Sequence, residues 1–458
     1  MNGATFQPKG QRRRLGQVKL VSWESLAYLY LVTTFALPQY FGVPLPGFAL
    51  TAHRLVTIAF IFTVFISRKH GRAFLWNFLG LPATIYLLPL LIVYAYTAIA
   101  VSSINSVAGF LVDMFLTFYI VYYCITEILG AKRSIKFVAK LVAVVCVLAI
   151  YDMLRRQNPY ELLHTIKSIK AEGGWRANSY RVAGLCGHPI AFGMYLMLLL
   201  PVICIDVEKK RFNLLHRPIT LLLMALAMLG TGSRGPVACF AGECLVFFAI
   251  SDRDYKRRYS GTIFLVFTAA VVLLVVFNEE RHIDRWFWLN VFQIVDQIFD
   301  THFTLDRYGY WQHALAINST DYRSELTQLF FSPDLDPILG RGNQGDTISF
   351  VSGGFYIESI DNFYVLQYIR YAWPGVTATL FCFVGLVFRC LSLWRKSGRN
   401  SIYLAIGVAF VAYYINLWTV AELGTMKFYL AVFAIACALA TCWGRATGDS
   451  SMEMAPPR

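Results

Sequence analysis

The chain has 458 residues, of which 57% are hydrophobic and 15% charged, and its mean hydropathy is +0.53. This composition excludes an ordinary soluble domain and a disordered chain, and it is typical of a polytopic membrane protein. The formal net charge of +14 fits a topology in which Lys and Arg gather on one side of a membrane, so we do not expect nucleic acid as a partner.

Apolar segments at or near the roughly 20 residues of a membrane-spanning helix recur along the whole chain. We predict twelve spans, at 25–41, 48–67, 81–101, 108–129, 137–153, 182–205, 219–232, 236–250, 262–277, 363–388, 402–417 and 428–442. If the basic N-terminus lies in the cytoplasm, every even-numbered span ends in a basic cluster, which is the positive-inside pattern. The predicted fold is therefore an all-α polytopic membrane protein with both termini in the cytoplasm.

The predicted organisation has five parts. They are an N-terminal tail at 1–21, spans one to nine at 22–277, a polar loop at 278–360, spans ten to twelve at 361–443 and a C-terminal tail at 444–458. The loop is too long and too polar to lie in hydrocarbon, so we expect a partly helical cap on the outer face between spans nine and ten. The hydrophilic first twenty residues do not resemble a removable signal peptide.

Two helices are expected inside the cap. Apolar residues at helical spacing over 282–300 predict an amphipathic helix lying in the membrane interface. A second helix is expected to begin near Thr304 and to carry Arg307, Tyr310 and Trp311.

The cap also contains the spacing GxGxxG at Gly340, Gly342 and Gly345. We interpret it as a turn, because the nucleotide-binding motif needs a strand before it and a helix after it. No metal-binding motif stands in the outer loops, and all ten cysteines lie in or at the edges of apolar spans, so we expect neither a metal nor another cofactor.

Two ionisable residues in the first spans are notable. Arg54 is close to the outer end of span two, where we expect its side chain to snorkel toward the interface. Asp113 lies deep in span four, and a carboxylate there is either a functional group or half of a buried ion pair. Both interpretations remain open from the sequence.

Three arginines are the candidate catalytic cations. Arg181 stands at the mouth of span six, Arg234 on the tight glycine- and proline-containing turn 231–236, and Arg307 on the cap. The cap is acidic, so an anion beneath it would be held by particular arginines, whose planar fork pairs bidentately with phosphate oxygens. We expect these three to converge. The alternative for Arg234 is an anchor for phospholipid headgroups.

Five short motifs follow one another between about residues 180 and 385. In chain order they are Arg181-Val182-Ala183-Gly184 with His188-Pro189, Gly232-Ser233-Arg234-Gly235, Arg307 with Trp311 and Ala314-Leu315, Pro337 with Gly340-x-Gly342, and Asp361-Asn362-x-Tyr364. Together they resemble the O-antigen ligase and O-antigen polymerase superfamily. The resemblance implies a metal-independent glycosyltransferase of the GT-C type at the outer face of the bacterial inner membrane. Such enzymes transfer a glycan from an undecaprenyl diphosphate carrier to an acceptor hydroxyl.

One departure from the family pattern favours the polymerase branch. Ligases have a catalytic histidine beside an asparagine just after the loop, and here Asp361 precedes Asn362. The resemblance therefore implies an enzyme that joins lipid-linked repeat units into O-antigen, capsule or exopolysaccharide. Asp361 is the expected general base, with Glu358 in reserve, and Arg181, Arg234 and Arg307 neutralise the diphosphate.

The expected substrate-binding residues are Arg341, Asn362, Tyr310, Trp311 and Glu358. The expected partners are an undecaprenyl-diphosphate-linked oligosaccharide donor, a glycan acceptor, membrane lipids, a flippase and a chain-length regulator. Two alternatives stay open: a ligase that transfers glycan to lipid A-core, and a transporter or flippase of lipid-linked sugar. Transporter folds often carry two repeats, whereas the large loop here falls in the second half only.

Overall fold

The computed structural model describes residues 22–45, 48–67, 71–72, 74–75, 83–101, 104–169, 174–176, 179–253, 255–257, 261, 268, 292, 295–296, 301–308, 325–333, 335–342, 360–420 and 424–447. Nearly all of the predicted span 262–277 and most of the predicted cap lie outside these residues, as do the predicted N-terminal tail and most of the predicted C-terminal tail.

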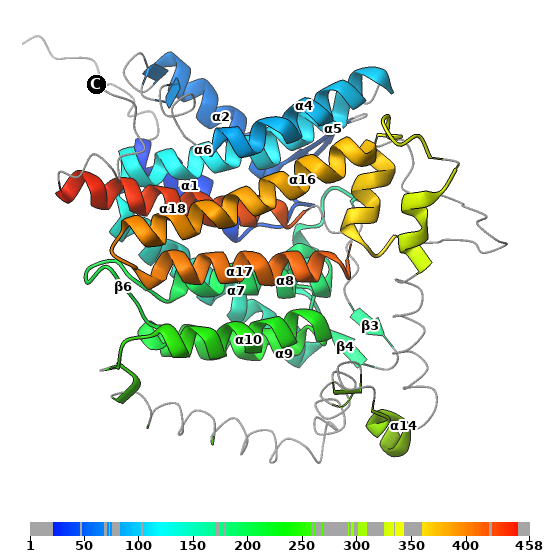
Figure 1. Cartoon of the computed structure of the whole chain (residues 1–458). Coiled ribbons are helices and arrows are strands. Elements are labelled where there is room, and N and C mark those ends of the chain that lie inside the picture. Colours follow the sequence, from blue (N-terminus) through cyan, green and yellow to red (C-terminus); the bar gives the residue numbers. More distant parts are fainter. Residues whose placement is uncertain are drawn as a thin grey trace, which may run out of the picture.

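The described part is mostly helical (Figure 1). Its α-helices are α1 Trp23–Phe35, α2 Ala52–Ile66, α4 Thr84–Ala100, α5 Ile104–Gly109, α6 Leu116–Tyr123, α7 Ala131–Arg155, α8 Pro189–Ile203, α9 Pro218–Gly230, α10 Arg234–Ile250, α14 Phe303–Tyr308, α16 Phe363–Lys396, α17 Ser401–Leu417 and α18 Met426–Thr447. The π-helices η1 Phe110–Phe115 and η2 Cys124–Leu129 flank α6 without a break. Short 3-10 helices are η3 Pro159–Leu163, η4 Gly184–Cys186, η5 Leu214–His216 and η6 Thr327–Phe331.

Every predicted span that falls within the described residues corresponds to a helix. Among the described residues, four helical stretches are long and apolar enough to cross a membrane: Val107–Leu129, Ala131–Arg155, Phe363–Lys396 and Met426–Arg445. Shorter apolar helices are Ala52–Ile66, Thr84–Ala100, Pro189–Ile203, Pro218–Gly230 and Ser401–Leu417. The prediction of a mostly helical protein with membrane-spanning helices is confirmed at this level.

Three short antiparallel hairpins were not predicted. They pair β1 Gly42–Leu45 with β2 Phe48–Thr51, β3 Gly174–Arg176 with β4 Ser179–Arg181, and β5 Ile205–Asp206 with β6 Arg211–Phe212. β3–β4 and β6 lie at opposite ends of the helical bundle (Figure 1). The two ends are called here the β4 end and the β6 end.

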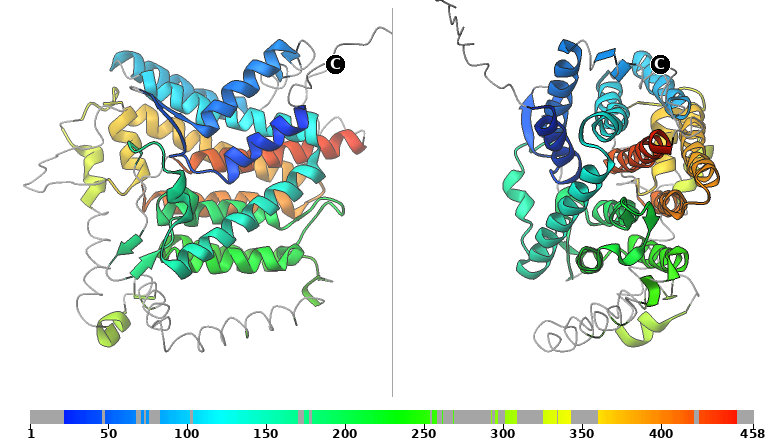
Figure 2. Two further views of the ribbon diagram at one scale, coloured as in Figure 1. Left: turned by 180° about the vertical axis from the view of Figure 1, so that it is seen from behind. Right: turned by 90° about the vertical axis from the view of Figure 1, so that its left-hand side faces the viewer.

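The long helices run back and forth between these two ends, as the end-on view in Figure 2 shows. α18 lies at the centre, and the side chains of 428–440 are all buried. It contacts α6, α8, η1 and η2, and its many alanines allow close helix packing where lipid replaces water. A hydrogen bond of 3.0 Å between the hydroxyls of Tyr122 and Thr441 joins α6 to α18.

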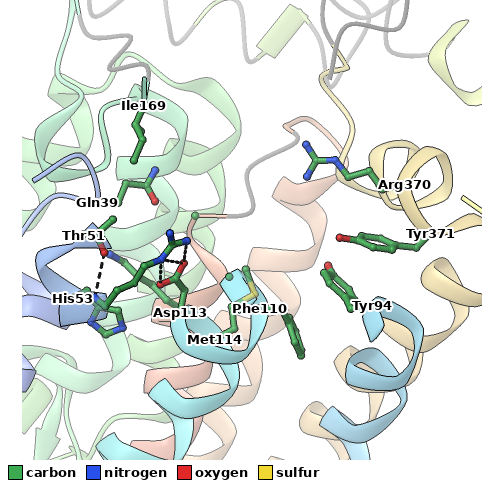
Figure 3. A pocket seen from close by; sticks show the side chains of 14 residues that line it. Gln39, Thr51, His53, Tyr94, Phe110, Asp113, Met114, Ile169, Arg370 and Tyr371 are labelled. Atoms are coloured by element: carbon green, nitrogen blue, oxygen red, sulfur yellow. Dashed lines mark hydrogen bonds and ion pairs between the residues drawn. The ribbon is translucent and has the colours of Figure 1, made fainter. Parts of the chain in front are cut away.

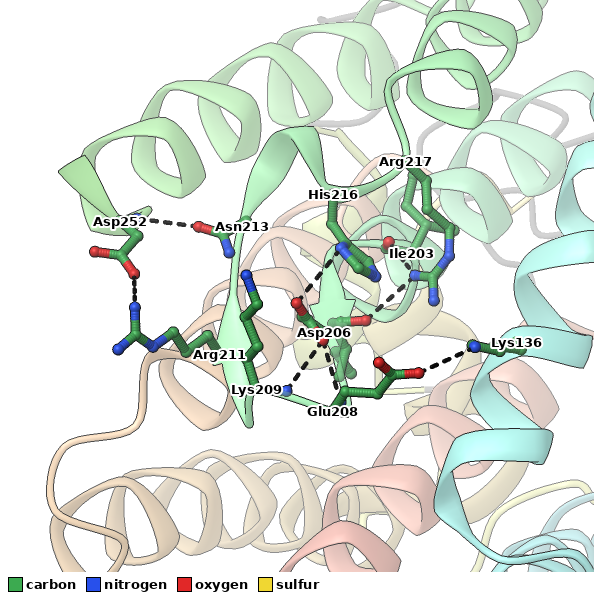
Figure 4. A network of polar contacts seen from close by, with 11 residues as sticks. Lys136, Ile203, Asp206, Glu208, Lys209, Arg211, Asn213, His216, Arg217 and Asp252 are labelled. Atoms are coloured by element: carbon green, nitrogen blue, oxygen red, sulfur yellow. Dashed lines mark hydrogen bonds and ion pairs between the residues drawn. The ribbon is translucent and has the colours of Figure 1, made fainter. Parts of the chain in front are cut away.

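Ion pairs join the loops of the β6 end (Figure 4). Lys136 of α7 donates to Glu208 in the β5–β6 turn over 3.2 Å, and Arg211 pairs with Asp252 after α10 over 2.6 Å. The helix ends and turns gathered here carry Lys132, Arg133, Lys136, Lys209, Lys210, Arg211, Arg217, Arg253, Arg395, Lys396, Arg399 and Arg445. The described residues of the basic clusters that the predicted topology assigns to the cytoplasmic side therefore lie together.

Candidate functional site

Helix α16 is broken at Ala372, which has φ 53° and ψ −160°. This backbone region is normally occupied by glycine, and it costs another residue about 1–3 kcal/mol. Pro374 follows, so the carbonyl of Arg370 has no helical amide to accept from. The break divides α16 into 363–371, which lies across the β4 end, and the straight run 373–396 (Figure 1).

The cap segment 337–342 provides the hydrogen bonds that the break removes. The amide of Arg341 donates to the carbonyl of Ile369 over 2.9 Å, and the amide of Gly342 donates to that of Arg370 over 2.8 Å. The amide of Trp373 donates in turn to the carbonyl of Pro337 over 3.1 Å. Backbone at membrane depth is stable only when such groups are satisfied. The segment 337–342, with the first two glycines of the motif, is therefore a docking segment for the broken helix.

A cavity of about 250 Å³ lies beside the break at the β4 end (Figure 3). Its lining residues come from the starts of α2 and α18, from α4, α5 and η1, from the break in α16, and from loops. They are Gln39, Thr51, His53, Arg54, Tyr94, Gly109, Phe110, Asp113, Met114, Ile169, Arg370, Tyr371, Gly424 and Lys427. The rings of Tyr94 and Tyr371 stack at 4.0 Å between centroids and form one wall. Broken helices that line a cavity often form binding sites in membrane proteins.

Arg54 and Asp113 form an ion pair on the opposite wall. Arg54 Nη2 lies 2.6 Å from Asp113 Oδ2 and Nε 2.9 Å from Oδ1, while Nη1 donates to the carbonyl of Ala49 over 2.7 Å. The side chains are 17% and 27% exposed. The prediction that Arg54 snorkels was wrong, because Asp113 holds it inward. Of the two interpretations of Asp113, the structure supports the paired one.

Arg370 and Lys427 are the cations that the sequence reasoning missed. They are only 9% and 6% exposed, and both line the cavity. Each interrupts an apolar run close to a helix start, where the topology predicts few basic residues. This interruption of an apolar run could have identified both residues from the sequence, because an ionisable residue inside a span is a functional candidate by default.

Arg181 is fastened to the turn that carries Arg234. Its Nε donates to the carbonyl of Thr231 over 3.0 Å, and its Nη2 donates to Ser233 Oγ over 2.7 Å. Gly232 has φ +56°, and a Cβ there would lie 3.4 Å from Arg181 Cγ. Arg234 is the first residue of α10. The structure thus brings the segments of two predicted catalytic arginines together at the β4 end.

The β4 hairpin is attached to α7 beside this turn. The hydroxyl of Tyr180 donates to the carboxylate of Asp152 near the end of α7. Burial, followed by the hydrogen bond to that carboxylate, raises the pKa of Tyr180 well above its ordinary value, so the phenol stays protonated. The neighbouring Arg181 is therefore held by two separate parts of the bundle.

Asp361 and Asn362 begin α16. Asn362 is buried, and its Oδ1 accepts from the amides of Tyr364 and Val365 over 3.0 and 3.2 Å. This is the usual task of an N-cap asparagine. Its Nδ2 has no hydrogen-bond partner among the described residues. Asp361 directly precedes this N-cap residue. It is half-buried and lies at the same end of the bundle.

Arg307, the third predicted catalytic arginine, stands apart from these groups. Arg307 is exposed on α14, and its Cζ lies 5.5 Å from the ring centroid of Phe292. α14 begins close to the predicted Thr304 and is capped by Asp296, which accepts from the amide of Phe303 over 2.9 Å. Figure 1 shows α14 outside the bundle, so Arg307 is not among the residues that the structure brings together.

The remaining predicted binding residues do not line the cavity or lie outside the described residues. The side chain of Arg341 is exposed, although its amide docks on the break in α16. Tyr310, Trp311 and Glu358 lie outside the described residues. Within the part of the chain that the structure describes, no group of three or more His, Cys, Asp or Glu could hold a metal ion.

No family model matches the chain, and no curated protein matches it either. The resemblance to the O-antigen ligase and polymerase superfamily therefore remains a prediction from the motifs. Two of those motifs have structural roles here: the turn with Arg234 receives Arg181, and Gly340-x-Gly342 docks on the broken helix. The candidate site has three parts, all at the β4 end. They are the turn 231–236 with Arg181 bound to it, the start of α16 with Asp361 and Asn362, and the cavity beside the break.

Proposed function

We propose that this chain is a polymerase that joins undecaprenyl-diphosphate-linked repeat units into O-antigen, capsule or exopolysaccharide. In this proposal twelve spans cross the bacterial inner membrane, both termini are cytoplasmic, and the β4 end faces the periplasm beneath the cap 278–360. The basic loops of the β6 end support that orientation, because Lys and Arg are retained on the cytoplasmic side.

One observation carries the proposal. Arg181 is held by Thr231 and Ser233 beside Arg234, at the same end as Asp361 and a cavity lined with further cations. A pre-positioned, permanently charged fork such as that of Arg181, bound to the serine next to Arg234, suits an oxyanion that must be stabilised as it departs. Each such donor contributes about 3 kcal/mol of transition-state stabilisation by analogy with an oxyanion-hole donor.

The proposed reaction is a single displacement at an anomeric carbon. The bond from that carbon to the diphosphate oxygen breaks, and a bond to the acceptor hydroxyl oxygen forms with inversion. The hydroxyl proton passes to Asp361, which contributes about 10²–10⁴ in rate as a general base, with Glu358 as the second candidate. The lipid diphosphate leaves against Arg181 and Arg234, with Arg307 of the cap as the third proposed cation.

The proposed substrate contacts involve residues around this centre. Asn362 offers its Nδ2, Arg341 lies on the docking segment, and Tyr310 and Trp311 provide aromatic faces for sugar rings. The proposed partners are the lipid-linked donor, the glycan acceptor and membrane lipids, with a flippase and a chain-length regulator. No cofactor enters the reaction.

The test is extension of lipid-linked repeat units by the purified protein in detergent with EDTA present. A ladder of longer glycans on the carrier is the expected product. Asp361→Asn is expected to lower the rate about 10²–10⁴-fold, and full activity in this folded variant would move the base elsewhere. Transfer to lipid A-core without extension would instead identify a ligase, and movement across liposomes without extension a transporter.

A further inference from the structure

The cavity beside the break in α16 is separate from the Arg181 turn and has its own cations. Among its described lining residues, Arg54, Arg370 and Lys427 face one carboxylate, Asp113. Figure 3 shows the guanidinium of Arg370 pointing into the space that Asp113 borders from the other side. Charges this deeply placed interact strongly with an anion, because little water screens them.

The Arg54–Asp113 pair gives the cavity a rigid wall. Asp113 holds the guanidinium of Arg54 through two of its nitrogens, and the carbonyl of Ala49 holds the third. The fork is therefore oriented before any ligand arrives, which lowers the entropy lost on binding. The carboxylate of Asp113 also makes the cavity selective. It repels any bound anion, so only an anion that also contacts Arg370 and Lys427 is held there.

The break in α16 places the opposite wall. Arg370 and Tyr371 directly precede Ala372, so the bend aims this part of the helix across the β4 end. The docking of Gly342 on the carbonyl of Arg370 holds that backbone from behind, over 2.8 Å. A strained residue kept in place by a docked segment is common at ligand sites.

A second, smaller cavity lies next to the first and is lined in part by the turn that follows Arg181. It shares Gln39, Gly424 and Lys427 with the first cavity and reaches Leu185 and Cys186. Those two residues lie in η4, the turn that follows Arg181. The cavity that holds Arg370 and Lys427 and the turn that follows Arg181 therefore border neighbouring spaces.

We propose that Arg54, Arg370 and Lys427 bind the diphosphate of the acceptor, the incoming lipid-linked repeat unit, while Arg181 and Arg234 take the diphosphate of the donor. This inference rests on the proposed function, in which both substrates of one step carry a lipid diphosphate. Two anionic groups must then be held at once, and one cationic site cannot serve both. No bond changes at the acceptor diphosphate, so Arg370 and Lys427 are binding residues and not catalytic ones.

The first experiment measures binding of inorganic diphosphate and of farnesyl diphosphate to the full-length purified protein. Wild type is expected to bind two diphosphates. In the double variant Arg370→Gln/Lys427→Gln, we expect the affinity of one of the two diphosphate sites to weaken at least tenfold. In Arg181→Gln, we expect the affinity of the other site to weaken. Arg399→Gln, an exposed arginine at the β6 end, is the matched control and should keep both. Equal weakening of both ligands assigns the site to phosphate itself, and weakening of farnesyl diphosphate alone assigns it to the lipid-linked form.

The second experiment separates this inference from the proposed function. Extension by Arg370→Gln/Lys427→Gln is expected to show a KM for the acceptor raised at least tenfold with kcat changed less. Unchanged binding and unchanged KM in this variant overturn the inference while the polymerase stands. Failure of wild type to extend any glycan overturns the proposed function itself.

A more conservative variant and a competing ligand complete the test. If the double glutamine variant unfolds, Arg370→Lys keeps the charge and is expected to keep both diphosphate sites, with reduced affinity at the cavity site only. Loss of both sites in this folded variant contradicts the inference. Displacement of diphosphate by glucuronate at equal concentration would assign the cavity to a glycan carboxylate, and it would also overturn the proposal.

Discussion

The amide of Gly342 donates to the carbonyl oxygen of Arg370 over 2.8 Å. This bond joins a cap segment to a membrane helix at the one carbonyl that Pro374 leaves without a helical donor. Because Arg370 also lines the cavity, the docking of the cap and the shape of the site depend on the same backbone.

Gly340→Ala tests that docking. A Cβ at Gly340 would lie 2.2 Å from the carbonyl oxygen of Arg370 and 2.3 Å from the amide nitrogen of Tyr371. Backbone atoms cannot move aside cheaply, so we expect the free energy of unfolding to fall by about 1–3 kcal/mol. Thermal unfolding in detergent measures the change, and proteolysis of 337–342 should become faster.

The matched control for that prediction is Gly242→Ala in α10. A Cβ there meets no heavy atom within 4 Å, and alanine is the better helix former by about 1 kcal/mol. This variant should be neutral or slightly more stable. Equal stability of Gly340→Ala and Gly242→Ala would show that 337–342 does not depend on its close approach to α16.

The pair Arg54–Asp113 predicts non-additive energetics. Asp113→Leu leaves a largely buried guanidinium without its carboxylate, and we expect it to cost about 1–3 kcal/mol of stability. Arg54→Met/Asp113→Leu removes both charges and should cost less than the two single changes together. Denaturant unfolding of the four proteins gives the cycle. Strict additivity would mean that the two side chains do not interact.

Ser233→Ala should weaken activity through Arg181. It removes the acceptor that lies 2.7 Å from Arg181 Nη2, and a hydrogen bond to a charged group contributes about 1.5–3 kcal/mol. The extension rate should fall by roughly tenfold or more, less than in Arg181→Gln. The control is Ser251→Ala, another buried and hydrogen-bonded serine, at the β6 end. It should lose similar stability and keep the rate, and a parallel loss of rate would remove the special role of Ser233.

His216 predicts a pH dependence of stability. Burial, then the charge of Arg217, holds the pKa of His216 below its ordinary value of 6.5, although Asp206 lies 3.9 Å away. The unfolded chain therefore binds the proton more readily, so the free energy of unfolding is fully retained above pH 6.5 and falls as the pH drops below it. His216→Gln should flatten this part of the profile. A wild type that gains stability relative to the variant on acidification would contradict the assignment.

The sequence predicts helices well here because apolar runs of membrane length leave few alternatives. The turn at Gly232 was also predicted from residue type, whereas the N-cap role of Asn362 was not. The short hairpins were not, since strands of two to four residues give no periodic signal.

The site was predicted in part. The proximity of Arg181 and Arg234 was expected from two motifs, whereas the cavity lies beside Ala372, an alanine in a glycine-like conformation next to the docked segment 337–342. No local pattern predicts such a break, although Pro374 marks its position. Arg370 and Lys427 come together from helices far apart in the sequence, so their proximity required the three-dimensional structure.

The most direct measurement of the central claim is the stoichiometry of one turnover. Purified protein in liposomes, supplied with lipid-linked repeat units, should release one undecaprenyl diphosphate for each new glycosidic linkage, and Arg181→Gln should slow both about 10²-fold together. Linkages formed without release of carrier diphosphate, or carrier movement across the bilayer with no new linkage, would contradict the account.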